Sequence, residues 1–207
     1  MAAPARIATP RGMLLENGAR MSRFEFHRRY EASDVERAEL IEGVVYVSSP
    51  LRMHQHGTPD AHLGAWMGVY VAGHADIEFG HNGSLVLDAD NEVQPDIILW
   101  RIGGGAYENA HGYLEGAPEL IAEVAASSMS VDLHGKKNAY RRNGVREYIV
   151  WRTLDEQLDW FVLEEGEYVR LEPDADGIIE SREFPGLRLH VEKLLAGDLA
   201  RVLAEIR

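Results

Sequence analysis

Two short apolar segments of this chain each carry one acidic residue, and this pattern restricts the possible folds more than any other feature. Asp96 precedes Ile97-Ile98-Leu99-Trp100, and Glu123 lies between Leu120-Ile121-Ala122 and Val124-Ala125. Both apolar segments are typical of buried strands. A carboxylate in such a strand is costly unless it is paired with a cation or binds a metal. The pattern therefore predicts two acids held in or beside a buried sheet.

A lysine at the start of a predicted helix adds a third group to these acids. It is Lys136, in Asp132-Leu133-His134-Gly135-Lys136. Two hard oxygen ligands and a nearby ammonium are what magnesium-assisted phosphodiester hydrolysis needs. Structural alternatives stay open for each group. Asp96 suits a turn that caps a loop, Glu123 suits a buried salt bridge with Lys136, and Lys136 suits a solvated helix face.

The bulk composition favours one domain without membrane segments. The chain has 207 residues, of which 45% are hydrophobic and 27% charged. Residues 1–20 contain no apolar segment of the secretory type, so we expect a flexible N-terminal arm followed by a single domain at 21–207. No apolar run reaches the ~18 residues that span a bilayer. The chain has no cysteine, which excludes disulfides, thiolate metal sites and cysteine nucleophiles and fits a cytoplasmic protein.

The charge of the chain opposes a general affinity for nucleic acid. Its formal net charge is −13, whereas non-specific DNA binding rests on Lys and Arg that neutralise phosphates. The basic residues are nevertheless concentrated near one predicted helix: Lys136, Lys137, Arg141, Arg142 and Arg146. This cluster is either a local phosphate-binding surface or an ordinary solvated helix face.

Apolar periodicity and turn signals predict the order of the elements. We expect a helix with Ser22 as N-cap and Glu25 at its third position. The other expected elements are a strand pair at 40–47 turning at Glu42-Gly43, a helix at 54–73, strands at 77–79 and 85–87 around a turn at 81–83, a glycine-rich loop at 103–116, a serine-rich turn at Ser127-Ser128, a helix at 131–142 ending at Gly144, a strand at 147–151, a hairpin at 157–171 and a closing helix at 191–206.

Several further residues are candidates for the same site. Glu39 stands at the junction of the first helix and the first strand, and the alternative is a surface glutamate. His54 and His56 open the long helix and suit phosphate or water contact, or a capping role. Tyr140, four residues after Lys136, shares its helix face. Other chemistries lack their motifs, since no His-Glu-x-x-His zinc spacing, no Gly-Lys-Ser/Thr phosphate loop and no Gly-x-Ser-x-Gly nucleophile motif occurs.

An ordered set of these segments resembles the Uma-type putative restriction endonuclease family, a branch of the PD-(D/E)xK nuclease superfamily. The resemblance covers roughly residues 21–195, and its specificity lies in the order of the segments. The matching segments are Ala38-Glu39-Leu40-Ile41-Glu42-Gly43, Ser49-Pro50 with His54, Gln94-Pro95-Asp96-Ile97, Gly116-Ala117-Pro118-Glu119-Leu120-Ile121-Ala122-Glu123-Val124, Asp132-Leu133 with Lys136 and Tyr140, Gly144-Val145-Arg146-Glu147-Tyr148-Ile149-Val150, and Phe184-Pro185-Gly186-Leu187.

The chain departs from the family pattern near the lysine. The superfamily lysine lies two residues after the glutamate, where this chain has Ala125, so the resemblance points to a lysine moved to the helix. The family usually has Ser-Pro-Ser in the turn that follows, and this chain has Ala126-Ser127-Ser128. The altered turn leaves Lys137 as an alternative to Lys136.

The resemblance implies an α/β fold and a metal-dependent activity. The fold would have a restriction-endonuclease-like core, a mixed, curved sheet flanked by helices, with an added C-terminal hairpin and helix. The reaction would be hydrolysis of a DNA phosphodiester with Mg²⁺, which Mn²⁺ can replace, and the default assembly is a homodimer. The implied site comprises Asp96, Glu123 and the Val124 carbonyl as metal ligands, Lys136 and Glu39 as further catalytic residues, and Gln94, His54, Tyr140, Arg141 and Arg142 around them.

Two other function classes remain open on the sequence. The same fold could serve as a non-catalytic binding or toxin-like module in which the acids are structural, and the net charge of −13 favours this reading slightly. A hydrolase of small phosphorylated molecules would also explain the acidity without DNA. Metal binding distinguishes the first alternative, and a comparison of plasmid with nucleotides distinguishes the second.

Overall fold

The computed structural model of the chain describes residues 14–48, 50–126 and 130–207. Ser49, the Ser127-Ser128 turn and the first 13 residues of the expected arm lie outside the described residues. The later part of the expected arm is packed on the domain: the Gly18 amide donates to the Val45 carbonyl at 2.7 Å, and Leu15 is buried. Residues of the expected arm thus contribute contacts to the domain.

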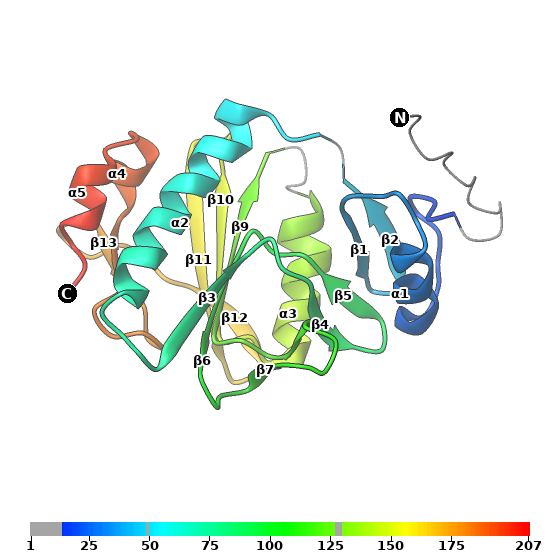
Figure 1. Cartoon of the computed structure of the whole chain (residues 1–207). Coiled ribbons are helices and arrows are strands. Elements are labelled where there is room, and N and C mark those ends of the chain that lie inside the picture. The colour runs from blue at the N-terminus through cyan, green and yellow to red at the C-terminus, as the bar shows by residue number, and fades with distance from the viewer. Residues whose placement is uncertain (1–13, 49, 127–129) are drawn as a thin grey trace, which may run out of the picture.

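The chain forms a mixed α/β structure (Figure 1). The helices are α1 (Arg23–Glu31), α2 (Thr58–Val71), α3 (Lys137–Asn143), α4 (Val191–Leu195) and α5 (Leu199–Leu203), and the π-helical turns η2 (Met53–Gly57) and η3 (Val131–Lys136) lead into α2 and α3. The strands are β1 (Ala38–Ile41), β2 (Val44–Val47), β3 (Ile77–His81), β4 (Leu85–Asp88), β5 (Asn91–Val93), β6 (Ile97–Arg101), β7 (Ala106–Glu108), β8 (Leu114–Gly116), β9 (Leu120–Ala125), β10 (Glu147–Arg152), β11 (Gln157–Glu164), β12 (Glu167–Arg170), β13 (Ile178–Glu180) and β14 (Arg188–His190).

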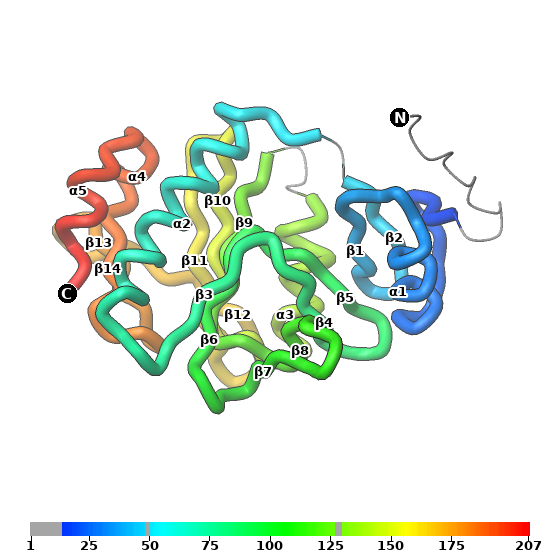
Figure 2. Tube along the Cα trace, viewed as in Figure 1, coloured from blue at the N-terminus to red at the C-terminus, as the bar shows by residue number. Residues whose placement is uncertain are grey.

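The strands form two six-stranded sheets and one strand pair. The central sheet has the order β12-β11-β10-β9-β6-β3, with β9 and β10 parallel and the other pairs antiparallel. The outer sheet has the order β2-β1-β5-β4-β8-β7, and β13 pairs with β14. The part of the chain with α1, β1 and β2 lies at one end of the molecule, and α4 and α5 lie at the other (Figure 2). The sequence predicted a single mixed sheet, so the outer sheet is an addition to that expectation.

The two faces of the central sheet have different surroundings, as the alternation of side chains along a strand requires. Ala122 and Val124 of β9 pack in the hydrophobic cluster formed with α2 and the C-terminal elements. Ile121 and Ala125 pack in a second cluster, with side chains of the outer sheet and α3. Glu123 alternates with the first pair, so it faces α3 and the outer sheet. The functional candidates therefore lie between the two sheets.

Several local predictions are confirmed. The Ser22 side chain accepts a hydrogen bond from the Glu25 amide at the start of α1. Glu42 and Gly43 both have positive φ, 53° and 70°, as a tight turn between β1 and β2 needs. Gly144 ends α3 in the left-handed region with φ 83°, which a glycine adopts without a steric penalty.

Three other expectations are confirmed only in part, because strand pairing depends on distant residues and Gly197 interrupts the last helix. β3 and β4 flank the predicted turn at 81–83, yet β3 pairs with β6 in the central sheet and β4 with β5 in the outer sheet. The glycine-rich loop at 103–116 contains the short strands β7 and β8. The predicted helix at 191–206 is divided into α4 and α5 by Gly197, whose φ is +75°. No helix in the described ranges is both long and apolar enough to cross a membrane.

A buried acid outside the candidate site joins the C-terminal segment to the central sheet. Glu147 opens β10, is fully buried and accepts hydrogen bonds from the indole of Trp160 (2.8 Å), the hydroxyl of Ser181 (3.0 Å) and the backbone amides of Arg182 and Glu183 (2.7 and 2.8 Å). Burial raises the pKa of Glu147, and these donors partly offset that effect. The carboxylate therefore has a structural role.

Replacement of Glu147 by alanine is expected to lower the free energy of unfolding by about 3 kcal/mol, since each donor left buried without an acceptor costs roughly 1–3 kcal/mol. Urea unfolding followed by tryptophan fluorescence measures this difference. Glu78→Ala is the matched control, because Glu78 is an exposed glutamate on β3, and its expected effect is within about 0.5 kcal/mol. Equal stability of the two variants would show that the Glu147 contacts do not stabilise the fold.

Candidate active site

The pairing of β6 with β9 brings the two acids together. Ile97 lies opposite Ala122 and Ile98 opposite Ile121. Continuing this antiparallel register by one residue places Asp96 opposite Glu123. Side chains of directly opposed residues project from the same face of a sheet. Asp96 and Glu123 accordingly line the same cavity, which has a volume of about 470 Å³.

Glu39 reaches the same cavity from β1 in the outer sheet. Ala38 and Leu40 pack in a third cluster with α1, whereas Ile41 packs in the second cluster against the central sheet. Glu39 alternates with the first two, so it faces the central sheet. Its Oε1 accepts a hydrogen bond from the Gln94 amide at 2.7 Å and forms an ion pair with Lys136 Nζ at 2.9 Å. Gln94 therefore positions Glu39 through its backbone.

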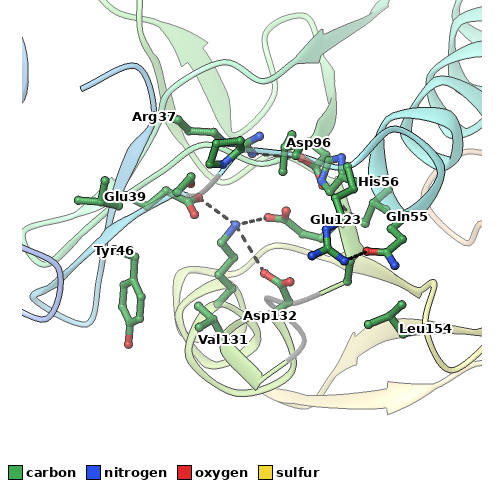
Figure 3. Close-up of a pocket in the computed structure, with 18 of the residues that line it drawn as sticks. Arg37, Glu39, Tyr46, Gln55, His56, Asp96, Glu123, Val131, Asp132 and Leu154 are labelled. Carbon is green, nitrogen blue, oxygen red and sulfur yellow. Dashed lines mark hydrogen bonds and ion pairs between the residues drawn. The ribbon is translucent and has the colours of Figure 1, made fainter. Parts of the chain in front are cut away.

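The ammonium of Lys136 lies among three carboxylates. Its Nζ is 2.9 Å from Glu39 Oε1, 2.9 Å from Glu123 Oε1 and 3.7 Å from Asp132 Oδ1, and these carboxylates surround it in Figure 3. Lys136 is only 3% exposed. Burial acts to lower its pKa, but Glu123 and Glu39 outweigh this effect and raise the pKa well above its ordinary value. The lysine is therefore held in its charged form.

Asp96 is held by cationic and backbone donors. Its Oδ1 accepts a hydrogen bond from Arg37 Nη2 at 3.1 Å, and its Oδ2 lies 2.8 Å from the Val124 amide and 3.2 Å from His56 Nε2. Burial acts to raise the pKa of Asp96, but His56 and Arg37 outweigh it and lower the pKa below its usual range. Asp96 is consequently ionised at the bottom of the cavity.

The pKa of Glu123 is shifted in the opposite direction to that of Asp96. Burial raises its pKa well above the ordinary value, and the charge of Lys136 opposes this only in part. The contacts of Glu123 are on one oxygen: Oε1 accepts from Lys136 and from the Tyr140 hydroxyl, both at 2.9 Å. Within the described residues, neither Glu123 Oε2 nor Glu39 Oε2 makes a hydrogen bond. Each of these carboxylates thus has one oxygen fixed by the protein and one available for a further cation.

The type of these groups fits a hard divalent cation. Glu39, Asp96, Glu123 and Asp132 place four carboxylates on the cavity wall, against the ammonium of Lys136 and the guanidinium of Arg37. Oxygen ligands of this kind are preferred by Mg²⁺ and Mn²⁺. In the described part of the chain no three His, Cys, Asp or Glu side chains are already arranged around a metal position.

The predicted site residues are only partly gathered here. Asp96, Glu123, Lys136, Glu39 and Val124 line the cavity, and Gln94 and Tyr140 contact its acids. His54 is exposed and is not part of the wall. Arg141 and Arg142 also lie outside the wall, where they pair with Glu167 and Glu42. Lys137, the alternative to Lys136, instead has its ammonium 3.4 Å from the centre of the Phe161 ring.

Three residues of the cavity wall were not identified as site residues from the sequence, or were given only an unspecific role. Arg37 contacts Asp96 and precedes Glu39 by two residues, so it shares a strand face with an acid already singled out. His56 approaches Asp96, whereas the sequence had favoured its neighbour His54. Asp132 precedes Lys136 by four residues, a spacing that places both on one helix face. Spacing relative to Glu39 and Lys136 was the available signal for Arg37 and Asp132, and no such signal pointed to His56.

Comparisons with known proteins concern the family and the fold of the chain. A family model described as "Uma2: Putative restriction endonuclease" matches residues 24–192. No curated protein matches the chain. A crystal structure of a putative nuclease belonging to DUF820, from Anabaena variabilis ATCC 29413, matches with a TM-score of 0.64 and 13% identity, over 82% of this chain and 96% of that chain. This likeness concerns the fold. The family match covers most of the chain, and the chain therefore belongs to the Uma2 family of putative restriction endonucleases.

Proposed function

We propose that this protein is a metal-dependent endonuclease that hydrolyses phosphodiester bonds of DNA. Membership of a nuclease family supports the reaction class. The observation that carries the proposal is the cavity wall, where Glu39 and Glu123 share one ammonium and each keeps an oxygen without a hydrogen bond in the described residues. A purely structural ion pair does not need two further carboxylates on the same wall.

In this proposal Asp96, Glu123 and the Val124 carbonyl would hold Mg²⁺ or Mn²⁺, and Glu39 would hold a water or a second ion. The metal would supply an acidified water and would offset charge on the scissile phosphate. Lys136, charged and held between Glu39 and Glu123, would stabilise the negative charge that develops on the phosphoryl oxygens. Tyr140 and the Gln94 backbone would position Glu123 and Glu39 through the hydrogen bonds described above.

Arg37 and His56 would keep Asp96 ionised and oriented. Both contact its carboxylate, and both lower its pKa. A carboxylate without a proton is the form that binds a divalent cation. These two residues would therefore act through Asp96 and not on the phosphate itself.

The recessed cavity gives one competing function a specific basis. A pocket of about 470 Å³ is of the size that encloses a small ligand, so a small phosphorylated molecule is the second candidate substrate. The experiment is a substrate panel of plasmid, linear duplex, oligonucleotides and nucleotides, each incubated with Mg²⁺, Mn²⁺ or EDTA. Cleavage of a polynucleotide only when metal is present supports the proposal. Hydrolysis confined to nucleotides would support the second candidate, and inertness toward the whole panel would support a non-catalytic module.

We also propose a homodimer for cleavage of both strands of a duplex, since each chain offers one such cavity among its described residues. We propose the cytoplasm as its location, which the absence of cysteine from the sequence favours. Sedimentation equilibrium of the purified protein, alone and with duplex DNA, tests the assembly. A monomer in both conditions would contradict it.

A further inference from the structure

Apolar side chains exposed to solvent form part of the cavity rim. Leu51 is 55% exposed and Leu154 is 60% exposed, although both line the cavity. They come from separate segments, Leu51 from the link between β2 and α2 and Leu154 from the turn between β10 and β11. The Thr153 hydroxyl donates to the Gln55 carbonyl at 2.7 Å and joins these segments. Gln55 and Leu154 are accordingly seen on the same side of the cavity in Figure 3.

The reactive groups lie below this rim. Asp96 and Glu123 are each 2% exposed, and Lys136 is 3% exposed. A scissile phosphate must therefore enter the cavity to reach them. Duplex DNA is stiff, with a persistence length of about 150 base pairs, and deforming it costs energy. An unpaired strand bends freely, and its phosphates and base faces are accessible separately. It therefore needs less deformation energy than a duplex to place a phosphate in this cavity.

The charges around the cavity point to the same kind of ligand. Duplex binding depends on many Lys and Arg contacts with phosphate. In the basic cluster of the α3 region, Arg141, Arg142 and Arg146 are paired with the acids Glu167, Glu42 and Glu183. Besides Lys136 and His56, the described residues of the cavity wall include two further basic residues, Arg52 and Arg37, and Arg37 contacts Asp96. Within the described residues, Arg37 forms its hydrogen bonds only through Nη2, so its Nε and Nη1 remain available to a phosphate.

We infer that the substrate of this site is an unpaired DNA strand, such as a single-stranded segment or flap. A base packs on Leu51 and Leu154, and the adjoining phosphate passes Arg37 to reach the acids. Packing of a base on an apolar surface compensates for the small number of phosphate contacts in a chain of net charge −13. The inference rests on the proposed nuclease function, but one cavity is enough for an unpaired strand, so it does not need the homodimer.

Binding, measured separately from cleavage, tests this inference. The Glu123→Gln variant is titrated, in Mg²⁺, into fluorescently labelled single-stranded DNA, the same sequence as a duplex, and the same sequence as single-stranded RNA, with anisotropy as the readout. The single-stranded DNA is expected to bind at least about tenfold more tightly than the duplex, from the apolar leucine surface that one packed base removes from water. This preference should persist as salt is raised, because apolar packing is not ionic. Equal or tighter binding of the duplex would overturn the inference, and tighter binding of the RNA would overturn the assignment to DNA.

Substitutions at the rim make the test specific to these residues. In the Glu123→Gln background, Leu51→Ser with Leu154→Ser is expected to weaken single-stranded DNA binding about tenfold, because it removes the apolar surface that the base covers, and to leave duplex binding little changed. Ile102→Ser is the matched control, since Ile102 is 58% exposed but follows the end of β6 opposite to Asp96. Equal affinities for the rim variant and the control would overturn the inference. The cleavage panel tests the proposed function independently. A nuclease that prefers duplex DNA would contradict the inference in the binding experiment and would still cleave DNA in the substrate panel.

Discussion

Replacing Lys136 by methionine is expected to lower the free energy of unfolding by about 3–5 kcal/mol and to abolish cleavage, because it leaves buried carboxylates without their cation. Methionine keeps the length of the side chain but removes the ammonium that lies 2.9 Å from both Glu39 and Glu123. Chemical unfolding of the purified variant measures the loss.

A divalent cation provides a sharper form of the same test. If the carboxylates around Lys136 accept a metal, Mn²⁺ should stabilise Lys136→Met more than it stabilises the unchanged protein, since it restores positive charge among the acids. Lys137→Met is the matched control. Lys137 lies over the Phe161 ring and outside the cavity wall, so its loss is expected to cost about 1 kcal/mol or less and to retain activity. If Lys137→Met abolished cleavage and Lys136→Met retained it, the catalytic role would belong to Lys137.

Replacing Glu123 by glutamine is expected to reduce cleavage by at least about 10³-fold while the fold persists, since a lost metal ligand removes several kcal/mol of charge stabilisation. The amide oxygen of glutamine can still accept the hydrogen bonds that Lys136 and Tyr140 donate to Glu123. The variant therefore isolates the ligand role from the structural one. Initial rates on a labelled oligonucleotide measure the effect, with circular dichroism as the check of folding.

Glu119→Gln is the matched control for that substitution. Glu119 is also buried and stands next to β9, but it accepts a hydrogen bond from the Arg101 amide and does not line the cavity. The control is expected to keep most of the activity. A Glu123→Gln variant as active as the Glu119→Gln control would reject Glu123 as a ligand and would reduce its ion pair with Lys136 to a structural feature.

The central acids could be predicted from the sequence because a carboxylate within an apolar strand is recognisable from its immediate neighbours. A carboxylate inside Leu120–Ala125 is visible without any structure, and the spacing of four between Lys136 and Tyr140 places both beside Glu123. What local pattern could not provide is the pairing between distant segments. The outer sheet, which brings Arg37 and Glu39 over the central sheet, depends on contacts between β1 and β5 that no short-range signal records.

Burial of an acid was by itself an incomplete guide to the site. Glu147 is as deeply buried as Glu123 and also stands in an apolar strand. Its oxygens accept four hydrogen bonds from the indole of Trp160, the hydroxyl of Ser181 and two backbone amides, and it does not line the cavity. Glu123 differs because it shares a cation with other carboxylates and faces an open volume. Only the folded chain distinguishes these two environments. The partners of Glu147 come from β11 and the C-terminal segment, whereas those of Glu123 come from η3 and α3.

The two histidines near the site also could not be distinguished from the sequence. His54 and His56 are both close to the start of α2, and their spacing of two cannot decide which one faces the site. The π-helical turn Met53–Gly57 turns His56 inward toward Asp96 and leaves His54 exposed. A wider turn of this kind has no clear sequence signature and is frequent at functional sites.

The most direct test of the central claim is the metal dependence of cleavage by the unchanged protein. Purified protein is treated with EDTA, and cleavage of a labelled single-stranded oligonucleotide is followed before and after Mg²⁺ or Mn²⁺ is restored. We expect no cleavage in EDTA, recovery with either metal, and no recovery in Glu123→Gln. Cleavage that continues unchanged in EDTA, or that Glu123→Gln performs at the rate of the unchanged protein, would contradict the assignment of this cavity as a metal-dependent nuclease site.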